Sequence, residues 1–143
     1  MHYLWRAVDQ DGDVIDILLQ KRKDKGAAMR FFKKLLEKQV RIPYQMYTDK
    51  LKSYAAAKNE MIPSVNHIHN RYSNNRAENS HQRTRQQERQ MRGFKSHKQA
   101  QIFLSIHGQI NNLFNLGRHL MKAEYYRTFR DRALNDWTEI SCA

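Results

Sequence analysis

The chain has 143 residues, of which 40% are hydrophobic and 28% charged, and its formal net charge is +12. That length is enough for one hydrophobic core, and the apolar content excludes a disordered chain. No run of 18 apolar residues occurs and the first residues lack a signal-peptide pattern, so neither a membrane-spanning helix nor secretion is expected. The single cysteine, Cys142, excludes an internal disulfide and suits a reducing cytoplasm.

The positive charge is concentrated away from the first twenty residues, which hold four aspartates and only Arg6 as a basic residue. Between Arg71 and Lys98, eight basic residues stand against Glu78 and Glu88. This stretch is poor in large apolar side chains, so it does not match an amphipathic membrane anchor. The phosphate backbone of a nucleic acid is the better partner.

The first part of the chain predicts a β-hairpin followed by a helix. Two β-prone segments, Tyr3–Val8 and Val14–Leu19, flank an Asp-Gly turn. Asp24 is placed to cap a helix over residues 25–38, in which apolar residues recur on one face.

The rest of the chain alternates short strands with helices. In order, the patterns predict a strand at 44–48, a helix over about 50–60, a short strand within 63–70, a helical stretch that opens at 74–75, is interrupted near 93–96 and resumes through 114, and a last helix over about 122–138. This order predicts an α/β fold in which helices pack on the faces of a mixed sheet.

Asp49 is the first candidate for chemistry, because it ends a predicted strand and precedes a predicted helix. Sheets of α/β proteins place ligand-handling groups at such positions. The structural alternative is that Asp49 caps the following helix, since aspartate is a favoured N-cap.

Glu78 is the second candidate, because helical spacing puts it on one face with Arg85, Arg89 and Arg92. A carboxylate among guanidiniums suits a metal-dependent enzyme acting on a phosphodiester: the acid holds the cation and the arginines hold the phosphates. Two structural alternatives stand beside this. With Asn75 as N-cap, Glu78 would complete a capping box, and a basic helix face is often merely solvated.

Several stretches resemble DDE transposases of the insertion-sequence-six family, and the resemblance covers most of the chain. It is carried by residues 2–9, Thr48-Asp49-Lys50, the block Asn74-Asn75-Arg76-Ala77-Glu78-Asn79-Ser80-His81, and residues 89–96. The resemblance implies an RNase H-like mixed sheet flanked by helices, here lacking the first core strand, with a helical C-terminal extension. Residues 1–121 would form the catalytic core and residues 122–143 the extension.

The resemblance also implies two-metal-ion phosphoryl transfer. Asp49 would match the second and Glu78 the third of the acids that bind two Mg²⁺ or Mn²⁺ ions. DNA would be contacted by Arg76, Arg85, Arg89, Arg92 and Lys95. The implied partners are double-stranded DNA, as element ends and target, and further copies in a homodimer or higher synaptic assembly. The implied location is the bacterial cytoplasm, at the nucleoid.

Two other functions stay open at the level of the sequence. One is a non-catalytic, basic DNA-binding remnant that modulates an intact transposase. The other is a structural RNA-binding protein, which the aromatic residues favour least because they occupy apparent core positions rather than a stacking platform. Mg²⁺-dependent nicking of an element-end oligonucleotide would separate the first of these from an enzyme.

In the family, the first catalytic aspartate lies on a strand just before the segment that resembles residues 2–9. We therefore predict that residues 1–143 alone are an inactive fragment without measurable strand transfer. The check is incubation of the purified chain with element ends, target DNA and Mg²⁺. Transfer products that disappear in Asp49→Asn would contradict this prediction.

Overall fold

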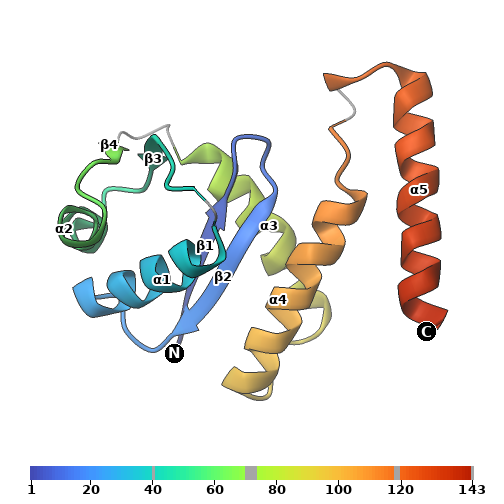
Figure 1. Cartoon of the computed structure of the whole chain (residues 1–143). Helices are drawn as coiled ribbons and strands as arrows, with labels where there is room; N and C mark the ends of the chain where they lie inside the picture. Colours follow the sequence, from blue (N-terminus) through green and yellow to red (C-terminus); the bar gives the residue numbers. More distant parts are fainter. Residues whose placement is uncertain (40, 70–73, 118–119, 143) are drawn as a thin grey trace.

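A computed structural model describes residues 1–39, 41–69, 74–117 and 120–142. The chain is mixed α/β, as the sequence predicted (Figure 1). In order, the elements are β1 (Tyr3–Val8), β2 (Val14–Gln20), α1 (Lys25–Lys38), β3 (Gln45–Tyr47), α2 (Lys52–Met61), β4 (Asn66–Ile68), α3 (Asn75–Gln90), α4 (His97–Phe114) and α5 (Ala123–Cys142).

The hairpin of β1 and β2 is the centre of the fold. The two strands are antiparallel, with Trp5 opposite Leu18 and an irregularity between Ala7 and Val8. Gly12 in the turn has φ +93°, a left-handed conformation that glycine adopts without the steric cost of a Cβ atom. The Asp-Gly signal therefore marked the turn correctly.

In the described part of the chain, the four strands form two separate two-stranded sheets, not the single mixed sheet expected from the sequence. β3 pairs in parallel with β4, and Met46 stands opposite His67. Each of these strands has three residues, and Met46 anchors the pair by packing against the helical core rather than by backbone bonds to β1. Among the described residues, β1 has no strand partner on its other edge.

One hydrophobic core lies between the hairpin and the helices α1 and α2. Trp5 packs against Phe31 of α1, with 6.1 Å between ring centroids, and against Tyr54 of α2, with 5.1 Å between ring centroids. Asp24 caps α1 as predicted: its Oδ1 accepts the backbone N–H of Ala27 at 2.8 Å. The cap and the apolar face together fix α1 on this side of the hairpin.

A second core lies on the opposite face of the hairpin, under α4. Val14 and Ile17 of β2 pack with Leu104. At Gly108 an added Cβ atom would lie 3.2 Å from Cγ1 of Val14, so glycine permits the close approach of α4 to β2. Figure 1 shows the hairpin between α1 on one side and α3 and α4 on the other.

Two side-chain amides of α4 close the outer edge of β2. Gln101 accepts the N–H of Leu19 at 2.7 Å and donates to the carbonyl of Ile17 at 3.2 Å. Asn112 accepts the N–H of Val14 and donates to its carbonyl, both at 2.8 Å. A side-chain amide has the donors and acceptor of a peptide group, so these two residues take the place of a neighbouring strand.

The last helix, α5, lies beside α4 and reaches Cys142, a few residues beyond its predicted end. Its buried residue is Ala133, and Trp137 meets Phe114 with 6.2 Å between ring centroids. Within the described part of the chain, no helix has the length and apolar character that crossing a membrane requires.

Replacing Gln101 with leucine should lower the free energy of unfolding by about 1–3 kcal/mol, because the N–H of Leu19 loses its acceptor in a partly buried place. Urea unfolding measures the change. Gln109→Leu is the matched control, since Gln109 lies on the same helix and is exposed. Equal effects of the two substitutions would contradict the edge-closing role of Gln101.

Candidate functional site

Asp49 lies two residues after the end of β3, and its carboxylate is turned towards the start of α2. Its Oδ1 accepts the backbone N–H of Leu51 at 3.1 Å. Leu51 is the N-cap residue of α2, and no side chain caps this helix. The alternative that Asp49 is the N-cap is therefore wrong, because the helix begins two residues too late. Burial and the charge of Asp49 together raise the pKa of Tyr54.

The backbone that leads into Asp49 is fixed by β4. Oγ1 of the buried Thr48 lies 2.7 Å from Nε2 of His67, and the Thr48 N–H donates to a β4 carbonyl at 3.1 Å. Burial lowers the pKa of His67, and the nearby His69 and Lys58 lower it further. The imidazole of His67 therefore stands next to the strand end that presents Asp49.

Glu78 lies near the start of α3 and is exposed. The N-cap residue of α3 is Asn74, whose side chain makes no capping bond, and the backbone N–H of Glu78 donates to the Asn74 carbonyl at 3.1 Å. The capping box with Asn75 is therefore wrong, because Glu78 lies one position too far into the helix. In the described part of the structure, its carboxylate has no hydrogen bond or ion pair.

Glu78 shares one exposed face of α3 with Arg85 and Arg89. At about 100° of rotation per residue, these three positions fall within about 40° of one another. Arg85 and Arg89 therefore hold their positive charges along the same side of the helix as the carboxylate of Glu78.

Arg92 was expected to extend this face and does not, because α3 ends at Gln90. The Gly93 N–H donates to the Glu88 carbonyl at 2.9 Å, and the Arg92 N–H donates to the Arg89 carbonyl at 3.1 Å. This pattern ends a helix with one left-handed residue, a place that glycine usually takes. Here Arg92 takes it, with φ +56°.

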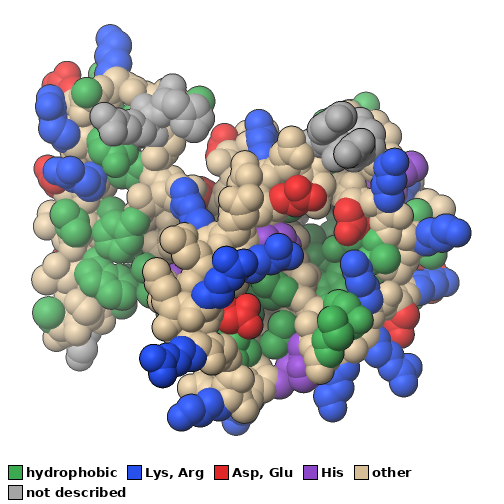
Figure 2. All heavy atoms as spheres, turned by 180° about the vertical axis from the view of Figure 1, so that it is seen from behind, with side chains coloured by type: hydrophobic (Ala, Val, Ile, Leu, Met, Phe, Trp, Pro, Cys, Tyr) green, Lys and Arg blue, Asp and Glu red, His purple; other side chains and the backbone are tan. Residues whose placement is uncertain are grey.

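The other two predicted DNA contacts lie at the two ends of α3. Nη1 of Arg76 donates to the carbonyl of Gln10 and so links the first turn of α3 to the hairpin turn. Lys95 is exposed in the connection between α3 and α4. Figure 2 shows Lys and Arg side chains spread over the side of the molecule opposite to that in Figure 1, with fewer acidic side chains among them.

Asp49 and Glu78 do not share a hydrogen-bond partner in the described structure. Within residues 1–39, 41–69, 74–117 and 120–142, no group of three or more His, Cys, Asp or Glu side chains could hold a metal ion. Carboxylate oxygens are nevertheless the hard ligands that Mg²⁺ and Mn²⁺ prefer. The donor chemistry of the two acids thus fits part of a ligand set for such an ion.

A buried arginine beneath α3 escaped the sequence analysis. Arg6 of β1 is only 9% exposed. Its Nη1 donates to the backbone carbonyl of Ser80 and, at 2.8 Å, to Oγ of the same residue. Its Nη2 donates to Oγ1 of Thr84. Burial lowers the pKa of Arg6 to about 10, so it is charged at neutral pH. The available signal was its alternation with Leu4 and Val8, which pack on the α4 side of the hairpin.

His81 shares the surroundings of Arg6. Burial lowers its pKa to about 4, and the charges of Arg6 and Arg85 contribute to the shift. The imidazole is therefore neutral at pH 7. It lies on α3 between the residues that Arg6 binds and the exposed face that carries Glu78.

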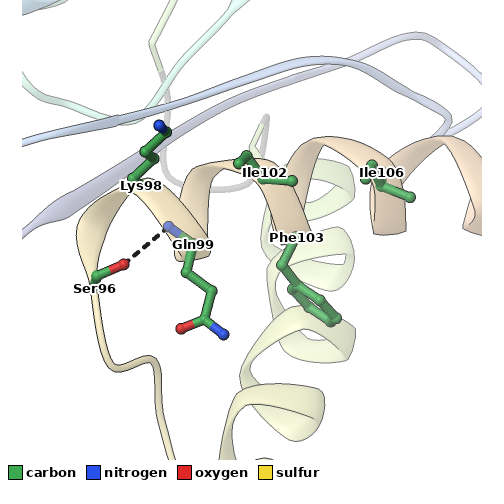
Figure 3. Close-up of a pocket in the computed structure, with 6 residues that line it drawn as sticks. All are labelled: Ser96, Lys98, Gln99, Ile102, Phe103 and Ile106. Atoms are coloured by element: carbon green, nitrogen blue, oxygen red, sulfur yellow. Dashed lines mark hydrogen bonds between the residues drawn. The ribbon is translucent and has the colours of Figure 1, made fainter.

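A hollow of about 480 Å³ lies along the first three turns of α4 (Figure 3). Its lining residues are Ser96, Lys98, Gln99, Ile102, Phe103 and Ile106. They include one cation and no carboxylate. This hollow is therefore not the place where Asp49 and Glu78 could hold a metal ion.

A family profile described as a DDE domain matches residues 1–116. The chain therefore belongs to the DDE transposase family, in the insertion-sequence-six group that its motifs resemble.

Among curated proteins, the chain is similar to the transposase for insertion sequence-like element IS431mec of Staphylococcus aureus strain Mu50, with 34% identity over 84 residues. The transposase for insertion sequence element IS257 in transposon Tn4003, also of Staphylococcus aureus, has the same identity over the same length. The matched stretch is 55% of this chain and only 37% of the length of each relative. No solved structure gives a significant match.

Arg92→Gly should raise the free energy of unfolding by up to about 1 kcal/mol, because glycine removes the steric cost of the left-handed conformation. Arg92→Ala is the control: it loses the same guanidinium but keeps the strained Cβ atom. Urea unfolding of the two variants gives the difference. If Arg92→Gly is no more stable than Arg92→Ala, the claim of strain at this position fails.

Proposed function

We propose that this chain supplies the catalytic core of a transposase, which cuts the ends of an insertion sequence and joins them to target DNA. The observation that carries the proposal is the family match over residues 1–116, within which Asp49 follows a strand and Glu78 lies on a helix beside arginines. In this proposal residues 1–121 form an RNase H-like core and residues 122–143 are a helical extension.

Asp49 and Glu78 would hold divalent cations, Mg²⁺ or Mn²⁺, two of them in the complete site. Such ions lower the pKa of an attacking water or 3′-hydroxyl and neutralise charge on the leaving oxygen. The carboxylate of Glu78, which is exposed and has no partner among the described residues, is available for this role. One oxygen of Asp49 is already oriented by the N–H of Leu51. A third acid would have to join them from outside the contacts described above.

The basic residues around Glu78 would bind the phosphates of double-stranded DNA. Arg85 and Arg89 follow the acid on the same exposed face towards the C-terminal end of α3, and Arg92 and Lys95 lie beyond the end of the helix. Arg76 also takes part, because a guanidinium has five N–H donors and Gln10 occupies few of them. The element ends and the target would meet in a homodimer or larger assembly at the bacterial nucleoid.

The second candidate function is non-catalytic DNA binding that modulates an intact transposase. The observation that favours it is the arginine face of α3, which can bind phosphates without any metal ion. The two candidates share DNA affinity and its salt dependence. They differ in whether Asp49 and Glu78 matter for a reaction.

The test is a chimaeric enzyme in which residues 1–116 replace the matching domain of the IS431mec transposase. We expect Mg²⁺-dependent cleavage at element ends that falls about 100-fold or more in both Asp49→Asn and Glu78→Gln, because the loss of a metal ligand removes several kcal/mol of transition-state stabilisation. Glu88→Gln is the matched control, since Glu88 is also an exposed acid of α3.

The outcome separates the candidates. Cleavage that needs Asp49 and Glu78 but not Glu88 supports the catalytic proposal. Cleavage that survives in Asp49→Asn and Glu78→Gln contradicts it. A chimaera that binds element ends as tightly as the relative yet never cleaves them supports the second candidate.

A further inference from the structure

The helix that carries Glu78 has almost no apolar surface. α3 contains a single apolar side chain, Ala77, and its buried residue is the polar Thr84. Helices in proteins are normally held in place by an apolar face that packs on the core. α1 and α4 follow that rule, with Phe31 and Leu104 in the two cores. α3 must be held by something else.

Three arginines attach α3 to its neighbours through polar contacts. Arg76 binds the carbonyl of Gln10, and Nη1 of Arg83 donates to Oδ1 of Asn115 at 3.0 Å. Both contacts are exposed, so water competes for the same groups and their net contribution is small. The third contact, made by Arg6, is buried.

Arg6 reaches α3 from β1 and binds two successive turns at once. Its two terminal nitrogens donate separately, one to Ser80 and the other to Thr84. A planar guanidinium can do this because its donors have a fixed fork geometry. Nε of Arg6 has no partner, and within the described residues no carboxylate pairs with its charge. Such burial of a cation costs stability, which a role in orientation would explain.

We propose that Arg6 is the positioning residue that holds α3, and with it Glu78 and Arg85, in a fixed place relative to β1. Ser80 and Thr84 lie about 120–160° around the helix from Glu78. Arg6 therefore binds the rear of α3 and leaves the face with Glu78 and Arg85 exposed. The part of this inference that concerns catalysis rests on the proposed function, whereas the attachment of α3 does not.

The first arm of the test measures the attachment of α3 in the chain itself. In Arg6→Met, which keeps the length but removes every donor, amide hydrogens of residues 79–90 should exchange at least about tenfold faster. Those of α1 should keep their protection, because the core around Phe31 is unaltered. Arg22→Met is the control for the loss of one exposed arginine, and it should change the exchange rates of neither α3 nor α1.

Arg6→Lys separates geometry from charge, because one ammonium keeps the charge but cannot span Ser80 and Thr84. We expect faster exchange in α3 than in the unaltered chain, but slower than in Arg6→Met. NMR titration of His81 gives a second readout. Its pKa, lowered to about 4 by burial, Arg6 and Arg85, should rise towards 6.5 when α3 moves away. In Arg6→Lys the positive charge at position 6 remains, so a rise in the His81 pKa would report movement of α3 and not loss of charge.

The second arm uses the chimaeric enzyme described above. Arg6→Met should lower kcat about 10–100-fold, as is usual when a residue that orients a ligand is lost. KM for DNA should change much less, because the arginines of α3 are still present. Arg6→Lys should recover part of kcat.

Each outcome has a fixed meaning. Unchanged exchange in α3 and an unchanged His81 pKa in both variants would overturn the inference. Faster exchange with unaltered kcat would overturn the positioning role. If Asp49→Asn and Glu78→Gln leave cleavage intact, the proposed function fails, and the exchange arm still decides whether Arg6 holds α3. Should Arg6→Met not fold, Arg6→Lys carries both arms.

Discussion

The fold depends on one constraint: the β1–β2 hairpin is covered on both faces. Side chains of a strand alternate between its two sides, so one side of the hairpin contributes Trp5 to the core with α1 and α2, while the other contributes Ile17 to the core with α4. The hairpin thus serves two cores that do not merge. Helices on either side take their positions from it, and β3 joins through Met46 on the α1 and α2 side.

α3 is the exception to this arrangement, and the exception matters because it carries Glu78. A helix without an apolar packing face can carry acidic, amide and guanidinium side chains around most of its circumference. Such a surface suits a polyanionic partner such as DNA. The same composition removes the apolar packing that normally fixes a helix, and among the contacts of α3 described above the buried one is made by the guanidinium of Arg6. The exposed face with Glu78 and Arg85, which we propose binds DNA and metal ions, and the face that Arg6 contacts therefore lie on different sides of one helix.

The sequence predicted those features that follow from local patterns. The Asp-Gly turn, the Asp24 cap and the amphipathic α1 were predicted correctly because neighbouring residues determine them. Contacts between distant segments were not predictable in this way: the two separate sheets depend on strand edges, and the role of Arg6 depends on residues more than seventy positions away. The helix-end assignments for Asp49 and Asn75 failed by one or two residues, and Arg92 adopts a conformation for which glycine is the usual residue. Whether Asp49 and Glu78 act together remains a prediction.

The amides of Gln101 and Asn112 have a consequence for self-association. They cover backbone groups of Val14, Ile17 and Leu19 on the outer edge of β2, whereas β1 has no partner strand on its outer edge within the described residues. A sheet with two free edges can add copies without end, as fibres do. A hairpin with one free edge can pair with only one other hairpin, because the resulting sheet has no free edge to which a further strand could add. Two described hairpins that pair through β1 would therefore form one four-stranded sheet, whose outer edges the amides of Gln101 and Asn112 keep from growing further.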